Sequence, residues 1–300
     1  MPHALRKSPI PETHTFIIRE LKEPYFDPNW HFHQEYQLFV VLKGSGTRFV
    51  GDNIKSFEEG DVVFTGPNLP HLWRSDVIYF DGNPDLYTHG IVIYLHEHFP
   101  GKDLIRKEEA IRLRHFLERS KLGLEILGNS AKKITHMMQQ LLKKEGLESI
   151  IFLLQILNEL MHSNEICELS SPGYTNTLKD GDTEIMNLIH AYVMDNFKQK
   201  ISLKEVASIA NMTPSSFSRY FKMHANKTFT ELVCEVRIGY ACRLLIEKKM
   251  NVSQACYESG YQTITNFNRQ FKTLMKRTPL QFKKEYEETP HTHAKVASSK

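Results

Sequence analysis

Residues 201–284 contain the same helix-turn-helix pattern twice, and this internal repeat limits the fold more than any other feature of the chain. In the first copy, Ser202 and Glu205 have the spacing of a capping box, and apolar residues follow at helical intervals. Asn211 can adopt the left-handed conformation that ends this helix, and Thr213-Pro214 predicts the start of a second one. Two short helices joined by a tight turn form a helix-turn-helix.

The second copy lies about fifty residues later and has the same order of signals. Asn251 and Gln254 have the spacing of the second capping box, and Thr263 is expected to cap the second helix of this copy. The Phe-x-x-x-Phe-Lys sequence that begins at Phe217 begins again at Phe267. The repeat predicts two helix-turn-helix motifs, at about residues 201–222 and 251–272.

Each second helix of the repeat is predicted to have an aromatic buried face and a polar exposed face. Side chains four positions apart lie on one face of a helix, so the two phenylalanines of each copy belong to the core. The polar face carries Ser, Thr, Asn and Arg, the residue types that reach base edges and phosphates in a major groove. The residues predicted to bind DNA are Ser215, Ser216, Ser218, Arg219 and Lys222 in the first copy and Thr265, Asn266, Asn268, Arg269 and Lys272 in the second.

The charge of the chain is divided unevenly between its two halves. Residues 198–284 carry 16 Lys and Arg against 5 Asp and Glu, whereas residues 1–197 carry 20 against 27. The net charge of +3 therefore combines a basic segment with a mildly acidic one. This asymmetry is expected when one domain binds a polyanion and the other does not.

The repeat resembles the DNA-binding domain of the AraC/XylS family of bacterial transcription regulators. The matching residues are the first unit at 201–222, Val236-Arg237-Ile238 in the connection, Gly260-Tyr261 and Phe271-Lys272 in the second unit, and Thr278-Pro279 after it. The chain departs from the family at Lys276, where the family usually has glycine. The resemblance implies a sequence-specific transcription regulator that is not an enzyme, with activation favoured over repression, and with double-stranded DNA and RNA polymerase as partners.

The N-terminal half changes to short β-type runs separated by Gly and Pro turns. The expected strands are Thr15–Ile18, Tyr36–Leu42, Thr47–Val50, Ile54–Phe57, Val62–Phe64 and Ile91–Tyr94. Many short antiparallel strands with glycine and proline corners predict a small β-barrel or jelly roll.

The segment from Gly60 to His71, preceded by His31-x-His33, resembles the cupin-like sensor domain that regulators of this family often carry at the N-terminus. The candidate ligand-pocket residues are His31, His33, Glu35 and His71. Imidazoles and a carboxylate suit a divalent metal. The metal motif of the family, however, has a glutamate further along the first strand, and we assign that position to Leu38 in this chain. We therefore expect these residues to line a pocket for an unidentified small-molecule effector, with no metal or other cofactor.

Helical periodicity returns at residues 107–121, 130–144 and 147–161. The third segment is too apolar for a helix that faces solvent alone, and we expect part of it to form a homodimer contact. Residues 169–182 have the composition of a linker, and Thr183 is expected to cap the next helix. The predicted domains are a cupin-like effector-sensing and dimerisation domain at 1–168 and an AraC-type DNA-binding domain at 183–290, followed by a disordered tail at 291–300.

Several other classes of function find little support in the sequence. The four cysteines have no CxxC spacing, so we expect structural thiols. No apolar run approaches the length of a membrane span, and no signal peptide is evident, so we expect a cytoplasmic protein that does not contact a membrane. The alternative function is a metal-dependent cupin enzyme with a DNA-binding appendage, but no second catalytic set of residues accompanies the histidines.

Overall fold

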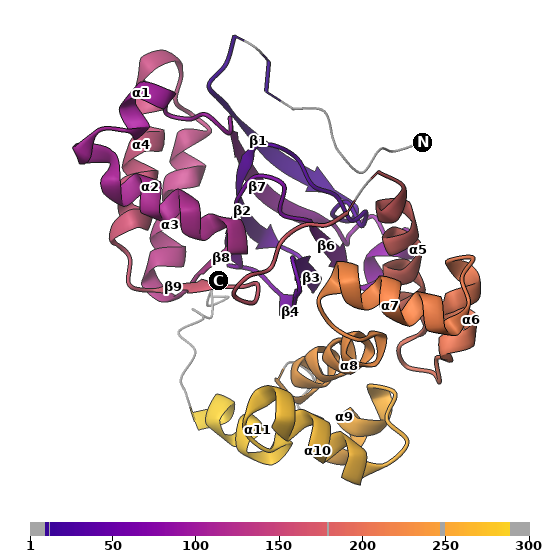
Figure 1. The fold of residues 1–300 in the computed structure, drawn as a ribbon. Helices are drawn as coiled ribbons and strands as arrows, with labels where there is room; N and C mark the ends of the chain where they lie inside the picture. Colours follow the sequence, from indigo (N-terminus) through magenta and orange to yellow (C-terminus); the bar gives the residue numbers. More distant parts are fainter. Residues whose placement is uncertain (1–9, 12, 179, 247–249, 289–300) are drawn as a thin grey trace. The chain divides into compact units, whose positions relative to one another are not determined.

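The computed structural model describes residues 10–11, 13–178, 180–246 and 250–288 (Figure 1). The chain divides into two compact units, one made of Met1–Tyr192 with Leu203–Phe229 and one made of Val193–Ser202 with Thr230–Lys300. This division, which follows the contacts within each unit, does not coincide with the predicted domain boundaries at 168 and 183. Those boundaries stay a prediction. Within the described residues, no helix is long and apolar enough to cross a lipid bilayer.

Two antiparallel sheets form the N-terminal part of the first unit, as the predicted cupin-like fold requires. The larger sheet has the strand order β1-β7-β2-β5-β8-β9, and the smaller has the order β4-β3-β6. The strands are β1 (Phe16–Glu23), β2 (Tyr36–Lys43), β3 (Gly46–Val50), β4 (Asn53–Phe57), β5 (Val62–Thr65), β6 (His71–Ser75), β7 (Thr88–Leu95), β8 (Leu124–Ile126) and β9 (Ile166–Glu168).

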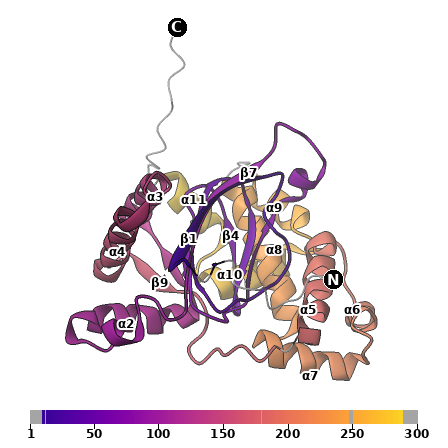
Figure 2. The same ribbon diagram turned by 90° about the horizontal axis from the view of Figure 1, so that it is seen from above.

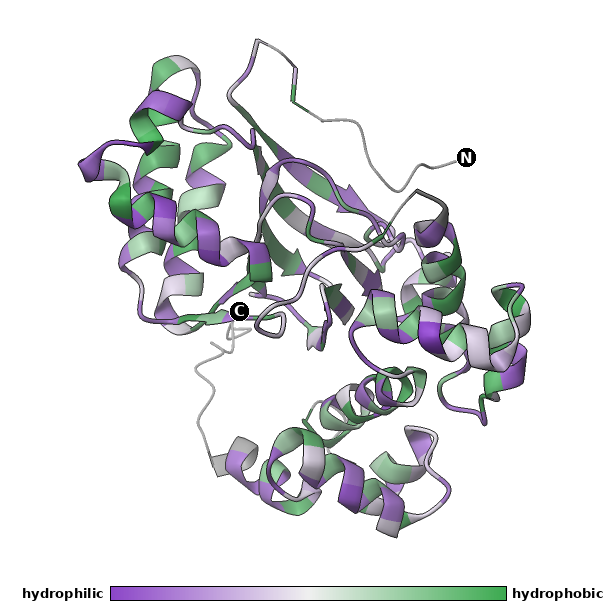
Figure 3. Cartoon of the chain, viewed as in Figure 1, coloured by the Kyte–Doolittle hydropathy of each residue, from purple (hydrophilic) through white to green (hydrophobic). Residues whose placement is uncertain are grey.

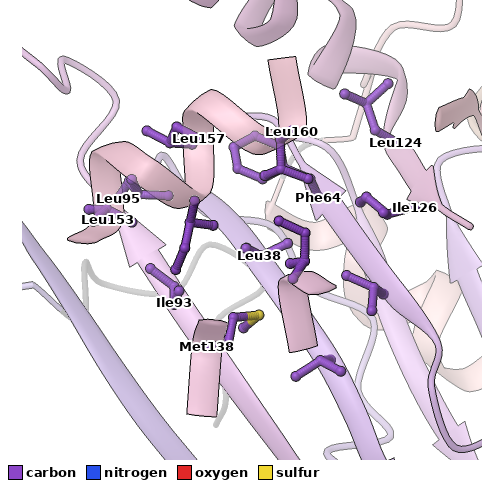
Figure 4. Packing of buried hydrophobic residues seen from close by; sticks show 14 of the residues in the cluster. Leu38, Phe64, Ile93, Leu95, Leu124, Ile126, Met138, Leu153, Leu157 and Leu160 are labelled. Atoms are coloured by element: carbon purple, nitrogen blue, oxygen red, sulfur yellow. The ribbon is translucent and has the colours of Figure 1, made fainter. Parts of the chain in front are cut away.

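Alternation along β2 divides the apolar residues of the larger sheet between two cores. Leu38 and Val40 belong to the cluster that packs against the helices, whereas Phe39 and Val41 belong to a second cluster that includes residues of the smaller sheet. This division follows from the two-residue period of a strand, which places successive side chains on opposite faces. Figure 4 shows Leu38 in the first of these cores, among side chains from the strands and the helices.

Helices α2, α3 and α4 cover one side of the larger sheet (Figure 1 and Figure 2). The first unit also contains short helical turns and the beginning of the helix that follows the predicted linker. The elements of this region are α1 (Lys102–Ile105), η1 (Val77–Phe80), η2 (Glu108–Ala110), α2 (Ile111–Arg119), η3 (Ser120–Leu122), α3 (Gly128–Leu141) and α4 (Gly146–His162). Helix α4 is half buried: Leu153 and Leu157 are each 1% exposed, whereas Leu147 and Ile151 are exposed.

A buried arginine of the smaller sheet forms an ion pair with a glutamate of the larger sheet. Arg48 of β3 is fully buried, and its guanidinium lies 2.7 Å from Asp61 Oδ1 and 2.8 Å from Glu125 Oε1 of β8. Lys55 adds a second cation, 2.6 Å from the same Glu125 oxygen. Removing one partner of such a network would leave an uncompensated buried charge, so these residues act as a structural crosslink.

The C-terminal part of the chain is helical, as predicted. Its helices are α5 (Asp180–Asn196), α6 (Leu203–Ile209), α7 (Pro214–Ala225), α8 (Phe229–Ile246), α9 (Val252–Glu258), α10 (Ile264–Met275) and α11 (Pro279–Glu288). Helices α6 and α7 form the first helix-turn-helix, and α9 and α10 form the second.

Some predicted boundaries were wrong. Helix α5 begins at Asp180, so Thr183 lies inside it and does not cap it. Strand β6 was missed because the preceding Pro70 suggested only a turn, yet His71–Ser75 pairs with β3 along its whole length. Strands of three residues such as β8 were missed because so short a run has no readable period. The predicted disordered tail at 291–300 lies outside the described residues.

Candidate DNA-binding surface and histidine cluster

Helix α7 begins and ends as its sequence predicts. The hydroxyl oxygen of Thr213 accepts a hydrogen bond from the backbone N–H of Ser216 at 3.3 Å, and Pro214 occupies the first turn. Asn226 ends the helix in the left-handed conformation, with a φ of 56°. Phe217 and Phe221 are fully buried, so the opposite face is turned away from the core.

Helix α10 has the same length of 12 residues and the same construction. Thr263 accepts a hydrogen bond from the Asn266 N–H at 3.4 Å, and Phe267 and Phe271 are fully buried. Lys276 ends the helix with a φ of 59°, the conformation for which glycine is the usual residue. The departure from the family at Lys276 therefore leaves the helix end in place.

The predicted DNA-binding residues lie on the surfaces of α7 and α10, where hydrophilic and hydrophobic residues alternate (Figure 3). Those that are exposed are Ser215, Ser218, Arg219 and Lys222 in the first copy and Thr265, Asn268, Arg269 and Lys272 in the second; Ser216 and Asn266 are partly buried. An exposed cationic and hydrogen-bonding face on a capped helix can enter a major groove.

Helices α7 and α10 differ in how their first turns are held. In α10 the Arg269 guanidinium donates to Asn266 Oδ1 at 3.0 Å, which restrains the arginine before any contact with DNA. In α7 the position of Asn266 is taken by Ser216, whose hydroxyl oxygen accepts from the Thr213 hydroxyl at 3.0 Å. The second helix therefore presents a preoriented arginine, whereas the first presents a cluster of hydroxyl groups.

The second helix-turn-helix rests on contacts that require glycine and arginine. Gly260 has a φ of +84°, and a Cβ at this position would lie 2.6 Å from the Phe197 carbonyl oxygen. That same oxygen accepts from Arg237 Nε at 2.7 Å, and Arg237 Nη2 donates to the Gln199 carbonyl oxygen at 2.6 Å. The family residues Arg237 and Gly260 thus fix the end of α5 within the second unit.

Three histidines meet in the first unit. His31 and His71 pair through their backbones, with the His31 N–H donating to the His71 carbonyl at 3.2 Å and the reverse bond at 2.9 Å. His33 follows two residues later, and one ring nitrogen from each of the three lies within 4.8 Å of the others. All three side chains are buried. The structure therefore brings together the three histidines that the sequence singled out.

The backbone fixes the tautomer of these histidines. Each ring Nδ1 lies within hydrogen-bond distance of a backbone carbonyl oxygen. The pairs are His31 with Asn29 at 2.7 Å, His33 with Glu35 at 3.1 Å and His71 with Leu69 at 2.7 Å. A carbonyl oxygen only accepts, so each Nδ1 carries a proton, and in the neutral ring the lone pair is left on Nε2. This is how metal-binding histidines are usually oriented by their surroundings.

Glu35 supports the cluster from behind and does not join it as a ligand. Its carboxylate Oε2 lies 3.4 Å from His33 Nδ1, the nitrogen that carries the proton. The group of residues able to hold a metal, among the described ones, consists of His31, His33 and His71. Glu35 therefore lies where a carboxylate that orients a metal-bound imidazole lies.

The residue that faces the histidines from β2 is Gln37, and the assignment of the glutamate position of the motif to Leu38 was wrong. Gln37 Oε1 lies 3.1 Å from His33 Nε2, whereas Leu38 points into the helix-covered core. An amide that turns its nitrogen to this ring would donate to the lone pair. Gln37 shares a face of β2 with Phe39, and Leu38 lies on the opposite face.

The donor set fits a divalent transition metal. Three neutral imidazoles are the protein ligands of one class of zinc site, and imidazole also suits copper, iron and nickel. Gln37 would have to release His33 Nε2, and it offers a neutral oxygen in place of a carboxylate. The expectation that no metal binds rested on the misplaced Leu38, and the geometry removes that reason.

Sequence reasoning missed a group of contacts around Trp30, which lies next to the cluster. Asn187 of α5 hydrogen bonds to the Trp30 backbone, and His190 of the same helix stacks on the Trp30 ring. These partners are separated by about 160 residues in the chain, so no local pattern could indicate the contact.

Two domain models match separate parts of the chain, and one relative matches most of its length. Residues 206–285 match the model of a helix-turn-helix domain, and residues 21–77 match that of a cupin domain. The chain is 25% identical to an uncharacterized HTH-type transcriptional regulator, YdeC of Bacillus subtilis, and the match covers 85% of each chain. It is 32% identical over 95 residues to an HTH-type regulator of Pseudoalteromonas carrageenovora, covering 32% of this chain and 56% of that relative.

Among solved structures, an AraC-type transcriptional regulator from Chromobacterium violaceum is similar at 15% identity and a TM-score of 0.34. This match covers 37% of the present chain and 98% of the other.

Proposed function

Because the chain is a DNA-binding transcriptional regulator of the AraC type, with a cupin domain ahead of its helix-turn-helix domain, we propose that α7 and α10 are its two DNA-reading helices. The observation that carries this proposal is the repeated construction: two capped helices of 12 residues, each with a buried Phe pair and an exposed arginine. Two such helices can enter successive major-groove segments about 34 Å apart on one duplex.

The test is recovery of preferred sites from random duplexes with the full chain, followed by affinity measurements over a range of salt. Affinity should fall steeply with salt because the basic segment displaces counterions from phosphates. A folded chain that shows no salt-dependent binding to any recovered duplex would refute the assignment.

We propose that the histidine cluster is the effector site and that it binds a divalent ion of the zinc class. Support comes from the three converging nitrogens and from the backbone carbonyls that hold each Nδ1 proton. Bound metal would supply a Lewis acid, and the three imidazoles would hold it. Elemental analysis and zinc titration of the full chain should give one ion per chain, and His71→Ala should lose it. His115→Ala, at an exposed position of α2, is the matched control.

A homodimer is proposed through α4. Leu147, Ile151 and Leu154 are 71%, 50% and 37% exposed, and their spacing places them on one side of the helix. A face of this kind is commonly covered by a partner. Sedimentation of the full chain tests this, and a strict monomer at high micromolar concentration would contradict it.

The proposed regulator acts in the cytoplasm as an activator that contacts RNA polymerase, and it has no enzymatic activity of its own. The AraC-type resemblance favours this direction. Transcription from a promoter carrying a recovered site, with purified RNA polymerase, should rise when the chain is added.

The alternative is a metal-dependent cupin enzyme, and the histidine cluster is the observation that favours it. Operator affinity measured with and without zinc separates the two functions. A stoichiometric ion that leaves DNA affinity unchanged would favour the enzyme, whereas an ion that changes DNA affinity would favour the regulator.

A further inference from the structure

We infer that the peptide group between Trp30 and His31 couples the histidine cluster to the first helix-turn-helix through Asn187 of α5. This inference rests on the proposed role of the cluster as the effector site. It assigns the residues by which occupancy of that site reaches α5, whose Asp182 carbonyl oxygen accepts a hydrogen bond from the Tyr220 hydroxyl of α7 at 3.1 Å.

The coupling passes through a single planar unit of backbone. The N–H of this peptide group belongs to His31 and donates to the His71 carbonyl at 3.2 Å. Its carbonyl belongs to Trp30 and accepts from Asn187 Nδ2 at 3.2 Å. Because a peptide group is rigid and planar, a rotation that adjusts His31 also moves the acceptor that Asn187 binds.

Asn187 grips Trp30 at both backbone groups. Its Oδ1 accepts from the Trp30 N–H at 2.5 Å, while its Nδ2 donates to the carbonyl. The Asn187 side chain thus makes the two backbone hydrogen bonds that a neighbouring strand would otherwise make to Trp30, the buried residue directly before His31. Both bonds depend on the orientation of the 29–31 segment.

Beside the hydrogen bonds of Asn187, the Trp30 ring lies in an aromatic contact whose nitrogen atoms lack hydrogen-bond partners within the described residues. The Trp30 ring stacks on His190 with centroids 5.0 Å apart, and Phe49 of β3 meets His190 edge-on at 4.8 Å. Burial lowers the pKa of His190 to about 3, and the nearby charges of Lys227 and Arg74 act in the same direction. The ring is therefore neutral at pH 7.

Three buried nitrogens at this contact have no hydrogen-bond partner within the described part of the chain. They are Trp30 Nε1 and both ring nitrogens of His190. A buried polar atom without a partner loses its hydrogen bonds to water and gains none, so this packing is less favourable than its aromatic area suggests. Small changes in the position of Trp30 can then shift the balance between docked and released α5.

A second attachment reaches the reading helix itself. Asn226, the residue that ends α7, donates from Nδ2 to Asp52 Oδ2 at 2.8 Å, in the turn between β3 and β4. The other carboxylate oxygen of Asp52 accepts from the Ser171 N–H at 2.8 Å. The sensor sheets therefore hold both α5 and the end of α7, while α10 belongs to the other compact unit.

The direction of coupling follows from the geometry. A ligand on His31 fixes this ring and therefore holds the shared peptide group in the orientation that Asn187 recognises. Occupancy should strengthen docking of α5, and docking should strengthen ligand binding by the same factor, since coupling between two sites is reciprocal.

The experiment measures zinc affinity of the full chain by titration calorimetry in the wild type, Asn187→Ala and Asn187→Asp. Alanine removes both bonds, and aspartate keeps an acceptor for the Trp30 N–H but loses the donor to the carbonyl. Each variant should bind zinc about 5- to 20-fold more weakly, within the usual range of coupling between sites. Asn158→Ala, an exposed asparagine of α4, should bind as the wild type does.

A second measurement closes the cycle and guards against unfolding. Zinc should change operator affinity in the wild type and should change it less in both Asn187 variants, with circular dichroism unchanged by the substitutions. Zinc affinities within twofold of the wild type in both folded variants would overturn the coupling and leave the metal site standing. A wild type that binds no zinc would overturn the site and the coupling together. If Asn187→Ala fails to fold, the zinc affinity of Asn187→Asp alone decides whether the coupling holds.

Discussion

Arg269→Ala is the substitution that most directly tests the proposal that α10 reads DNA. The arginine is exposed on α10, and Asn266 restrains it through a hydrogen bond of 3.0 Å. A bidentate arginine on a base edge contributes about 1–3 kcal/mol of discrimination, which corresponds to about 5- to 150-fold in affinity. We expect this loss on the preferred operator and a smaller loss on a scrambled duplex.

The hydrogen bond between Asn266 and Arg269 should make its own contribution to operator affinity. Without Asn266 the arginine must be immobilised on binding, which costs about 0.5–1.5 kcal/mol for a long side chain. Asn266→Ala should therefore weaken operator binding by about 2- to 12-fold, provided that Asn266 has no base contact of its own. The double variant should lose little more than Arg269→Ala alone, because the restraint has no effect once the arginine is gone.

Fluorescence anisotropy on the operator and on a scrambled duplex, at one fixed salt concentration, measures both effects. Lys272→Ala is the control for charge, and it should weaken both duplexes nearly equally and reduce the salt slope by about 0.9 if it binds one phosphate. If Arg269→Ala also acts equally on both duplexes, the arginine binds phosphate, and its role as a reader of bases is refuted.

The other predictions concern stability and assembly. Lys276→Gly should stabilise α10 by about 0.5–1 kcal/mol because a left-handed residue with a Cβ is strained, whereas Lys272→Gly, inside the same helix, should destabilise by about 1 kcal/mol; amide hydrogen exchange in α10 would show opposite signs, and equal signs would contradict the reasoning. Ile151→Glu should give a folded monomer by sedimentation, whereas Leu153→Glu, at a position 1% exposed, should unfold the first unit. The first unit should lose about 1.4 kcal/mol of stability per pH unit below about pH 6.5, because the unfolded state takes up a proton that His190, with a pKa of about 3, refuses. Urea unfolding followed by tryptophan fluorescence at pH 7 and pH 5 tests this, and His190→Leu should reduce the difference.

Much of the DNA-reading half was predictable because its signals are local. Thr213 and Thr263 cap helices as expected, and the capping box of Asn251 with Gln254 is complete on both sides. These bonds join residues three positions apart, so both partners of each bond can be recognised within one short stretch of sequence. The same holds for the buried Phe217, which follows from helical period alone.

The sensor half was predictable only in outline. The strands were recognisable by their apolar runs, but the face on which each side chain lies depends on a register that a slip of one residue reverses. Leu38 and Gln37 illustrate this, because only the packing of helices on one side of β2 shows which of them faces the histidines.

By itself the sequence determined what depends on neighbours along the chain: the repeated helix-turn-helix, the caps of α7, α9 and α10, the basic charge of one half and the histidines that belong together. The tertiary structure alone decided the tautomers of those histidines and the clamp of Asn187 on Trp30, a contact between residues 157 positions apart. The physical reason is that a hydrogen bond across the fold depends on the positions of both partners in space. Those positions are set by the packing of whole sheets and helices, which no local stretch of sequence encodes.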